Sequence, residues 1–195
     1  LSDLHTYSTS EFMTLDASTR RNLELTQTIR TGSVKGSLLG VLDATVTAMG
    51  GRLLRQWLNQ PLLDVDKLEQ RLDAVEALYR DTPTRTQVMA LLKELADLER
   101  LTSRVGQRIA VPRDLVGIRK SLEKVPQIRE ALSQLKGFES DHPLQTLLSQ
   151  LDPCQEIASL IGEAIVDDPP ATLASSEVIK PGFSAELDSI IAASR

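Results

Sequence analysis

Apolar residues recur at intervals of three and four along most of the chain, which is the spacing that places them on one face of an α-helix. The clearest example is residues 36–61, GSLLGVLDATVTAMGGRLLRQWLNQP, which combine a short apolar helix, a polar turn and a longer amphipathic helix. Thr47 is the expected N-cap of the longer helix, since its hydroxyl can accept from an exposed first-turn amide. Pro61 ends the helix, because proline cannot donate a ladder bond and disfavours α geometry at the preceding residue. The apolar face consists of Met49, Leu53, Leu54, Trp57 and Leu58.

Two glycines and one tryptophan indicate how this helix packs. Gly50 and Gly51 fall in its first turn, where glycine carries an entropic cost, so we expect another backbone to pack closely there. Trp57 lies on the apolar face, where tryptophan is more often part of a core than an exposed binding anchor. The pattern therefore predicts a buried helix docked into a larger helical core.

The same periodicity predicts further helices downstream. One covers Val65–Arg80, with Asp64 as its cap and Glu76 and Arg80 as a favourable pair one turn apart. Pro112 is suited to the first position of the longest helix, and Pro126 predicts a kink or break within it. The other helices are expected around residues 88–92, 98–105, 144–151, 154–166 and 185–195.

The remaining segments predict short strands and loops. Short strands are expected at Phe12–Leu15 and Leu23–Leu25, on either side of a helical turn at Ala17–Asn22, and a third at Val178–Ile179. Residues 1–11 are polar and expected to be mobile, and residues 31–37 and 167–176 are expected to be loops. The fold class is therefore mainly all-α, with long antiparallel helices and a minor short-strand element near the N-terminus.

Composition narrows the function classes. The 195 residues are 41% hydrophobic and 25% charged, which is enough to bury a core. The net charge of −5 and the 3% aromatic content argue against a nucleic-acid reader or a base-stacking platform. The single cysteine, Cys154, allows no intrachain disulfide and fits a reducing cytoplasm. No apolar run approaches the ~20 residues of a membrane helix.

Few residue patterns point to chemistry. In GSVKGS, residues 32–37, Lys35 precedes the second glycine, whereas a phosphate loop needs its lysine after that glycine, so we interpret the segment as a connector. His5 and His142, with one cysteine, give no zinc-ligand spacing, and His142 is expected to help cap the following helix. No pair of carboxylates stands out as a general acid and base, so we expect no catalytic centre.

Basic residues admit two interpretations. Arg100, Arg104 and Arg108 recur every four residues, which could serve phosphate contact or form a solvated face. Acidic residues are interleaved and no aromatic residue accompanies the arginines, so we favour the solvated face. Arg20 and Arg21 have the same two interpretations, and local pairing is favoured over DNA contact. The further basic residues are Arg113, Arg119 and Lys120, and the expected acidic partners are Asp97, Glu99, Asp114 and Glu123.

The segment LDATVTAMGGRLLRQWLNQPL, residues 42–62, resembles the start of the core, or lever, domain of the MutS family of DNA mismatch-repair proteins. The segments RLDAVEAL, LADLERLTSRV and PRDLVGIRKSL follow in the order found in that family, and VIKPGFSAELDSI resembles its entry into the clamp domain. LDASTRRNLEL precedes them. The residues that match the family's motifs and define its structural pattern are Asp16, Thr19, Arg21, Asn22, Asp43, Thr45, Thr47, Gly50, Arg52, Trp57, Pro61, Asp97 and Arg104.

The resemblance implies both an organisation and a role. Residues 1–11 would end a connector, 12–182 would form the first part of the lever domain, and 183–195 would begin the clamp. The full protein would be a cytoplasmic bacterial dimer that binds mismatched duplex DNA, hydrolyses ATP with Mg²⁺ and engages a MutL-type partner. The lever would couple these activities, with no catalytic, cofactor, metal or confident DNA-binding residue of its own. Arg104 would be held in buried pairs between helices.

The chain lacks an initiator methionine and ends within a predicted helix, so we expect it to be a segment of a longer protein. The resemblance implies that later helices complete the core. An apolar strip on the Leu115–Leu135 helix or its neighbour is therefore expected to be exposed and covered by self-association.

Three alternatives remain open. A MutS paralogue acting in recombination control would carry the same domain, although the clamp entry favours the repair branch. A stand-alone helical protein-interaction module is a different class. A helix-turn-helix DNA reader is disfavoured by the acidic balance.

Overall fold

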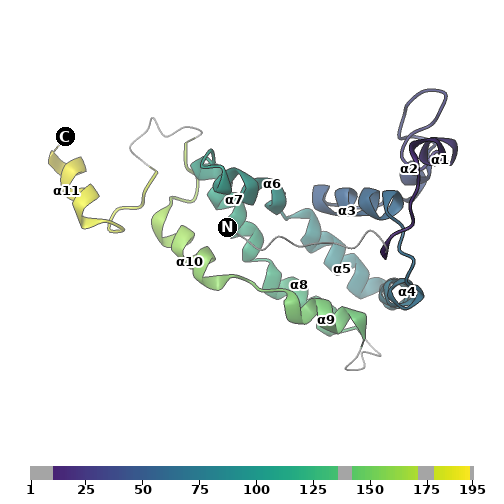
Figure 1. Ribbon diagram of the computed structural model, residues 1–195. Coiled ribbons are helices and arrows are strands. Elements are labelled where there is room, and N and C mark those ends of the chain that lie inside the picture. Colours follow the sequence, from purple (N-terminus) through teal and green to yellow (C-terminus); the bar gives the residue numbers. More distant parts are fainter. Residues whose placement is uncertain (1–10, 136–141, 171–177, 194–195) are drawn as a thin grey trace. The chain divides into compact units, whose positions relative to one another are not determined.

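The computed structural model describes residues 11–135, 142–170 and 178–193 (Figure 1). Helices dominate these ranges and no sheet is formed within them, so the predicted all-α class is confirmed. The chain divides into two compact units, which we describe separately: Leu1–Arg85 with Leu135–Thr146, and Thr86–Gln134 with Leu147–Arg195. The helices are α1 (Ala17–Asn22), α2 (Leu38–Leu42), α3 (Ala48–Asn59), α4 (Val65–Arg80), α5 (Thr82–Lys93), α6 (Leu98–Gly106), α7 (Pro112–Leu122), α8 (Val125–Ser133), α9 (Pro143–Gln150), α10 (Gln155–Ala164) and α11 (Ala185–Ala193).

Side-chain caps fix where many of these helices begin. Thr47 and Asp64 each accept a hydrogen bond from the amide three residues ahead, which confirms both predicted N-caps. Asp16, Ser37 and Asp97 do the same for α1, α2 and α6. These caps are local, which is why the sequence located the helix starts closely.

The predicted strands are the main error in the element assignment. Phe12 forms only an isolated bridge with Leu62, and the segment Leu23–Leu25 is a turn. The turn is stabilised by α2, because the amide of Leu39 donates to the carbonyl of Leu25 over 2.8 Å. Ile179 also pairs across an isolated bridge, with Ile165. A strand needs a partner along several residues, and each of these apolar segments meets its partner at a single position.

The predicted break near Pro126 is confirmed. Helix α7 ends at Leu122, and Pro126 lies in the first turn of α8. Proline has no amide to donate to the carbonyl of Leu122, and its ring would clash with that carbonyl in a continuous helix. The longest helix in the described ranges is therefore α4, with 16 residues, and not the one that Pro112 opens.

The core of the second unit lies where α7 packs against α10 and α6 (Figure 1). Its buried residues are Val116 and Ile118 of α7 together with Ile161 and Ile165 at the end of α10. Ser121 reinforces this core, because its buried hydroxyl accepts from the amide of Ala96 over 2.9 Å and donates to the carbonyl of Gly117. Helix α7 is therefore the central element of the unit.

The expected close backbone contact at Gly50 and Gly51 is wrong. A Cβ at Gly50 would lie 3.0 Å from the Thr47 hydroxyl oxygen and 3.4 Å from the Thr45 Cβ, and one at Gly51 would lie 3.3 Å from the Thr45 hydroxyl oxygen. The atoms that crowd the two glycines are thus side chains of the turn before α3. Glycine is required here because the turn folds back on the helix that it caps.

Trp57 is not the core residue that the sequence predicted. Its side chain is 37% exposed, and no residue of α3 is buried. The guanidinium carbon of Arg71, on α4, lies 3.8 Å from the centre of the Trp57 ring. This cation–π contact joins α3 to α4, and at a partly exposed ring it contributes about 0.5–1 kcal/mol.

Candidate functional site

The family-motif residues around α3 make a self-contained turn. Asp43 Oδ1 accepts from the amide of Thr45 over 3.0 Å and from its hydroxyl over 2.6 Å. These bonds from Thr45 hold the pKa of the Asp43 carboxyl below its usual value. Thr47 then caps α3, Arg52 is exposed on that helix, and the carbonyl of Pro61 accepts from the amide of Met13. The polar residues from Asp43 to Thr47 therefore close the connection between α2 and α3.

The motif residues around α1 are also used locally. Asp16 Oδ1 accepts from the amide of Thr19 over 2.6 Å, and this bond lowers the pKa of Asp16. Arg20 donates from Nε to the carbonyl of Leu15, which confirms the local pairing that the sequence favoured. Arg21 and Asn22 lie exposed at the C-terminal end of α1, and the local pairing of Arg21 stays a prediction.

Arg104 links two helices of the second unit. Its Nε lies 2.7 Å from Asp114 Oδ2 of α7, and its Nη2 donates to the carbonyl of Ile109. Asp114 also accepts from the amide of Val111 over 2.9 Å. That amide bond first, and Arg104 second, lower the pKa of Asp114. Arg104 is thus paired between helices, as the family resemblance implied, but the pair is only partly buried, since the Arg104 side chain is 32% exposed.

The three arginines do not form one continuous helical stripe. Helix α6 ends at Gly106, and Arg108 follows it with a left-handed φ of 59°. Asp97 accepts from the amide of Arg100 at the start of the same helix. Arg119, which the sequence placed near a solvated face, is only 8% exposed. A buried guanidinium needs partners, and Asp167 supplies one, with Arg119 Nη1 2.8 Å from Asp167 Oδ1.

Asp167 is the residue that the sequence reasoning missed. Residues 167–176 were expected to be a loop, but the Asp167 carboxylate lies close to two cations, Arg119 and Lys180. Besides Arg119, Lys180 brings its Nζ to 3.8 Å from Asp167 Oδ1. The hydrogen bond from Arg119 is the largest cause of a lowered pKa at Asp167. The sole feature of the sequence that marks this position is the pair of aspartates before two prolines, and it does not predict an ion pair.

The remaining candidate sites are connectors and caps. Ser37 accepts from the amide of Gly40 and starts α2, so residues 32–37 act as a connector. His142 Nδ1 accepts from the amide of Leu144 over 3.2 Å, which confirms its capping role, whereas His5 lies outside the described residues. Within the described segments, no three His, Cys, Asp or Glu residues gather as metal ligands, and no helix is both long and apolar enough to cross a membrane.

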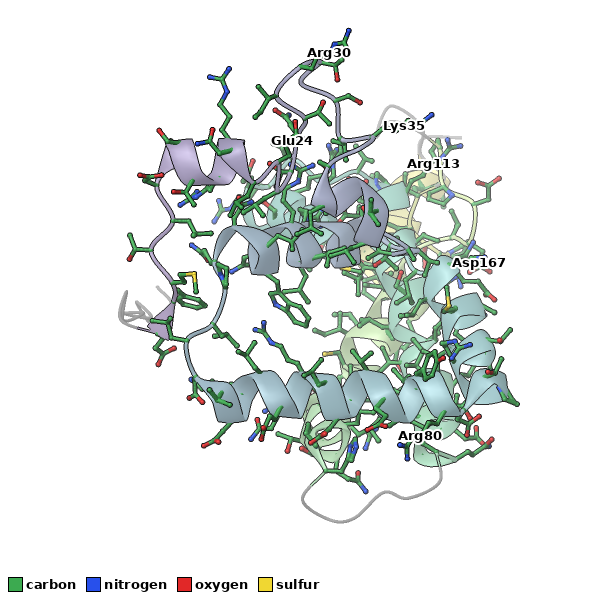
Figure 2. The ribbon with its side chains drawn as sticks, turned by 90° about the vertical axis from the view of Figure 1, so that its right-hand side faces the viewer. Glu24, Arg30, Lys35, Arg80, Arg113 and Asp167 are labelled. Atoms are coloured by element: carbon green, nitrogen blue, oxygen red, sulfur yellow. The ribbon has the colours of Figure 1, made fainter. Side chains whose placement is uncertain are left out.

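The strip expected on the 115–135 segment or its neighbour is exposed only on the neighbour, since α10 packs on α7 and exposes Ile157 and Leu160, at 51% and 56%. The segment 115–135 carries buried residues, among them Val116, Ile128 and Ala131. In the first unit, α4 also presents an apolar stripe, spaced by three and four residues, whose members are 38% to 75% exposed. We call this the α4 stripe; it consists of Val65, Leu68, Leu72, Val75 and Tyr79. Arg80, labelled in Figure 2, follows at the end of the same helix and pairs with Glu76.

Known proteins match this chain along nearly its whole length. The sequence model of MutS domain III matches residues 18–193. The DNA mismatch repair protein MutS of Halothermothrix orenii is 44% identical over 187 residues, which cover 95% of this chain and 20% of that protein. Those of Alkaliphilus oremlandii and Geobacillus sp. are 42% and 40% identical, and each alignment covers 100% of this chain and 22% of the relative. The chain thus spans about a fifth of the length of these relatives. On this match along nearly its whole length, the chain belongs to the MutS domain III family.

Proposed function

We propose that this chain is the first part of the lever domain of a bacterial DNA mismatch-repair protein, and that it couples DNA binding in one part of the protein to ATP hydrolysis in another. The observation that carries this proposal is where the polar motif residues direct their bonds. Asp16, Asp43, Thr47 and Arg104 all bond within the chain, to caps, turns and a neighbouring helix. Residues used in this way maintain geometry, which is what a coupling element requires.

The second unit is suited to move as one body. Helix α7 contacts α6 and α10, and the apolar core between them is joined by the Arg104–Asp114 pair and by the bond from Ala96 to Ser121. Close-packed interiors transmit displacement because they deform little. A shift at one end of such a unit is therefore passed to the other end.

In this proposal, DNA binding and ATP hydrolysis belong to other domains of the full-length protein. Mismatched duplex DNA would be bound by the clamp and mismatch-reading domains, and ATP with Mg²⁺ by an ATPase domain, in a cytoplasmic dimer that engages a MutL-type partner. Residues 1–11 would end the connector, 12–182 would form the first part of the lever, and 183–195 would begin the clamp. The negative net charge of −5 supports a chain with little phosphate contact of its own.

A distance measurement in the full-length protein tests whether the second unit moves as one body. Gln107, just after α6, and Glu156, in the first turn of α10, are both exposed and can carry spin labels. We expect their distance distribution to be the same without ligand, with mismatched duplex and with ATP. A distribution that broadens or shifts by several ångströms on ligand binding would show that the unit deforms, which would contradict the proposal.

A further inference from the structure

We infer that Asp167 is a positioning residue, which ties the segment following α10 back onto α7 and so fixes the course of the chain toward α11. We call the set Arg119, Asp167 and Lys180 the clasp. All three belong to the second unit, and they come from α7, from the residues after α10 and from the residues before α11 (Asp167 is labelled in Figure 2).

Arg119 provides the fixed end of the clasp. Its side chain is 90% buried beside the core, and its Nη1 lies 2.8 Å from Asp167 Oδ1. Glu123, the C-cap of α7, has its Oε1 3.5 Å from Arg119 Nε and is half exposed. A buried cation is costly unless it is paired and hydrogen-bonded. The buried guanidinium of Arg119 therefore fixes the position of the Asp167 carboxylate.

Lys180 provides the second cation and a helix cap. Its Nζ donates to the carbonyl of Gly162 over 2.7 Å, while lying 3.8 Å from Asp167 Oδ1. Gly162 lies in the last turn of α10, where carbonyls have no partner within the helix. A lysine there also complements the negative end of the helix dipole. Lys180 thus joins the end of α10 to the same carboxylate that Arg119 binds.

The backbone contact that the clasp supports is small. Val166 donates its amide to the carbonyl of Val178 over 3.1 Å, and Lys180 donates its amide to the carbonyl of Ala164 over 2.8 Å. Together with Ile165 and Ile179 these residues form one isolated bridge. So short a pairing is marginal by itself. The side chains of the clasp therefore stabilise this short backbone pairing.

The neighbouring carboxylate offers a matched control. Asp168 has a side chain that is 97% exposed, and its Oδ1 lies 4.0 Å from Arg113 Nη2. Arg113 itself donates from Nε to the carbonyl of Pro169 over 2.9 Å, a bond that does not involve a carboxylate. Asp168→Asn removes the same charge, one residue away, without touching the clasp. Any effect of Asp167→Asn beyond that of Asp168→Asn therefore reports on the clasp.

The functional consequence rests on the proposed function. A lever that passes motion to the segment after it needs a stiff joint, because a joint that swings absorbs the displacement. The clasp holds the joint between the α7–α10 core and the residues leading into α11. Loosening it should leave the ATP and DNA sites intact and weaken the communication between them.

The test uses Asp167→Asn, Asp167→Glu and Asp168→Asn in the full-length protein that carries this sequence. Hydrogen exchange at the amides of Val166 and Lys180 reports the bridge. The Asp167 side chain is 72% exposed, so the lost charge-assisted bond should make exchange about three- to tenfold faster in Asp167→Asn. Asp167→Glu should restore most of the protection, and Asp168→Asn should stay within about twofold of the wild type. Exchange in Asp167→Asn within twofold of the wild type would overturn the inference.

ATP hydrolysis provides the functional readout. In Asp167→Asn we expect the basal rate to stay within about twofold of the wild type, while the difference between mismatched and matched duplex falls at least threefold. A loosened bridge with an unchanged difference would overturn the positioning role and leave the proposed function standing. A wild-type protein whose hydrolysis does not respond to mismatches at all would instead refute the proposed function.

Discussion

The ion pair between Arg104 and Asp114 should stabilise the fold measurably, unlike the exposed pair between Arg80 and Glu76. The Arg104 and Asp114 side chains are 32% and 16% exposed, whereas those of Arg80 and Glu76 are 75% and 53% exposed. A hydrogen bond to a charged group contributes about 1.5–3 kcal/mol when it is shielded from water. Allowing for the partial exposure of Arg104, we expect a coupling energy of about 1–2 kcal/mol, against about 0.3–0.5 kcal/mol for the exposed pair.

Two double-mutant cycles measure this difference. The first uses Arg104→Met and Asp114→Asn, and the second uses Arg80→Met and Glu76→Gln, each followed by urea unfolding of the 195-residue chain. Asp114 Oδ2 accepts from both the amide of Val111 and Arg104 Nε, and an asparagine oxygen can still accept there without the charge. The first cycle therefore measures the part of the Arg104 bond that depends on the carboxylate charge. A coupling energy for the first pair no larger than that for the second would refute the reasoning that links burial to the strength of the pair.

Further predictions concern the core, pH and the exposed helices. Ser121→Ala should lower the free energy of unfolding by about 1–3 kcal/mol, because it leaves the partly buried amide of Ala96 without its acceptor. Ser133→Ala, on an exposed hydroxyl, should cost under about 0.5 kcal/mol, and equal losses of the two variants in urea unfolding would contradict this. The folded-state pKa of Asp114 is lowered, so its stabilisation is complete above the ordinary value of 3.8 and is lost as the pH falls through the folded-state pKa. In Asp114→Asn the free energy of unfolding should therefore fall less steeply as the pH is lowered below about 4. An equally steep fall in the variant would show that this carboxyl does not cause the pH dependence. Leu72→Lys, on the α4 stripe, should leave unfolding unchanged within about 0.5 kcal/mol and reduce self-association in sedimentation velocity, whereas a strongly destabilised variant would show that the stripe is buried. Trp57→Ala should cost about 1–2 kcal/mol, less than the 3–5 kcal/mol of a buried aromatic residue, and a larger loss in thermal unfolding would restore Trp57 to the core.

Local signals were predictable from the sequence. The caps at Thr47 and Asp64, and the break before Pro126, depend on residues within one turn of each other. Such interactions act over a few residues of chain, so a pattern of residue types is enough to locate them. The helical order and the family therefore followed from the sequence with little error.

Burial was the property that the sequence could not determine. An apolar face on a helix predicts that other residues cover it but does not identify them, and so Trp57 was assigned to a core that does not enclose it. The short strands failed for a related reason, because Phe12 meets its partner at one position only.

The clasp shows the same limit for charged groups. Arg119 and Asp167 are far apart in sequence. Glu123 offered Arg119 a nearer partner, and the sequence around Asp167 holds no basic residue before Lys180. Only the packing of α10 on α7 brings these two side chains together. The pairing of a buried charge is therefore a tertiary property, even where every helix is located correctly.

The central claim is that the packed core of the second unit carries communication between DNA binding and ATP hydrolysis. It is tested most directly by weakening that core in the full-length protein with Ile118→Val and Ile161→Val, each expected to cost about 0.5–1.5 kcal/mol, with Ile157→Val on an exposed position as the control. The measurement is the difference in ATP hydrolysis between mismatched and matched duplex. We expect this difference to shrink in the core variants, while duplex affinity and basal hydrolysis stay within about twofold of the wild type. An unchanged difference in variants whose core is measurably less stable would contradict the account.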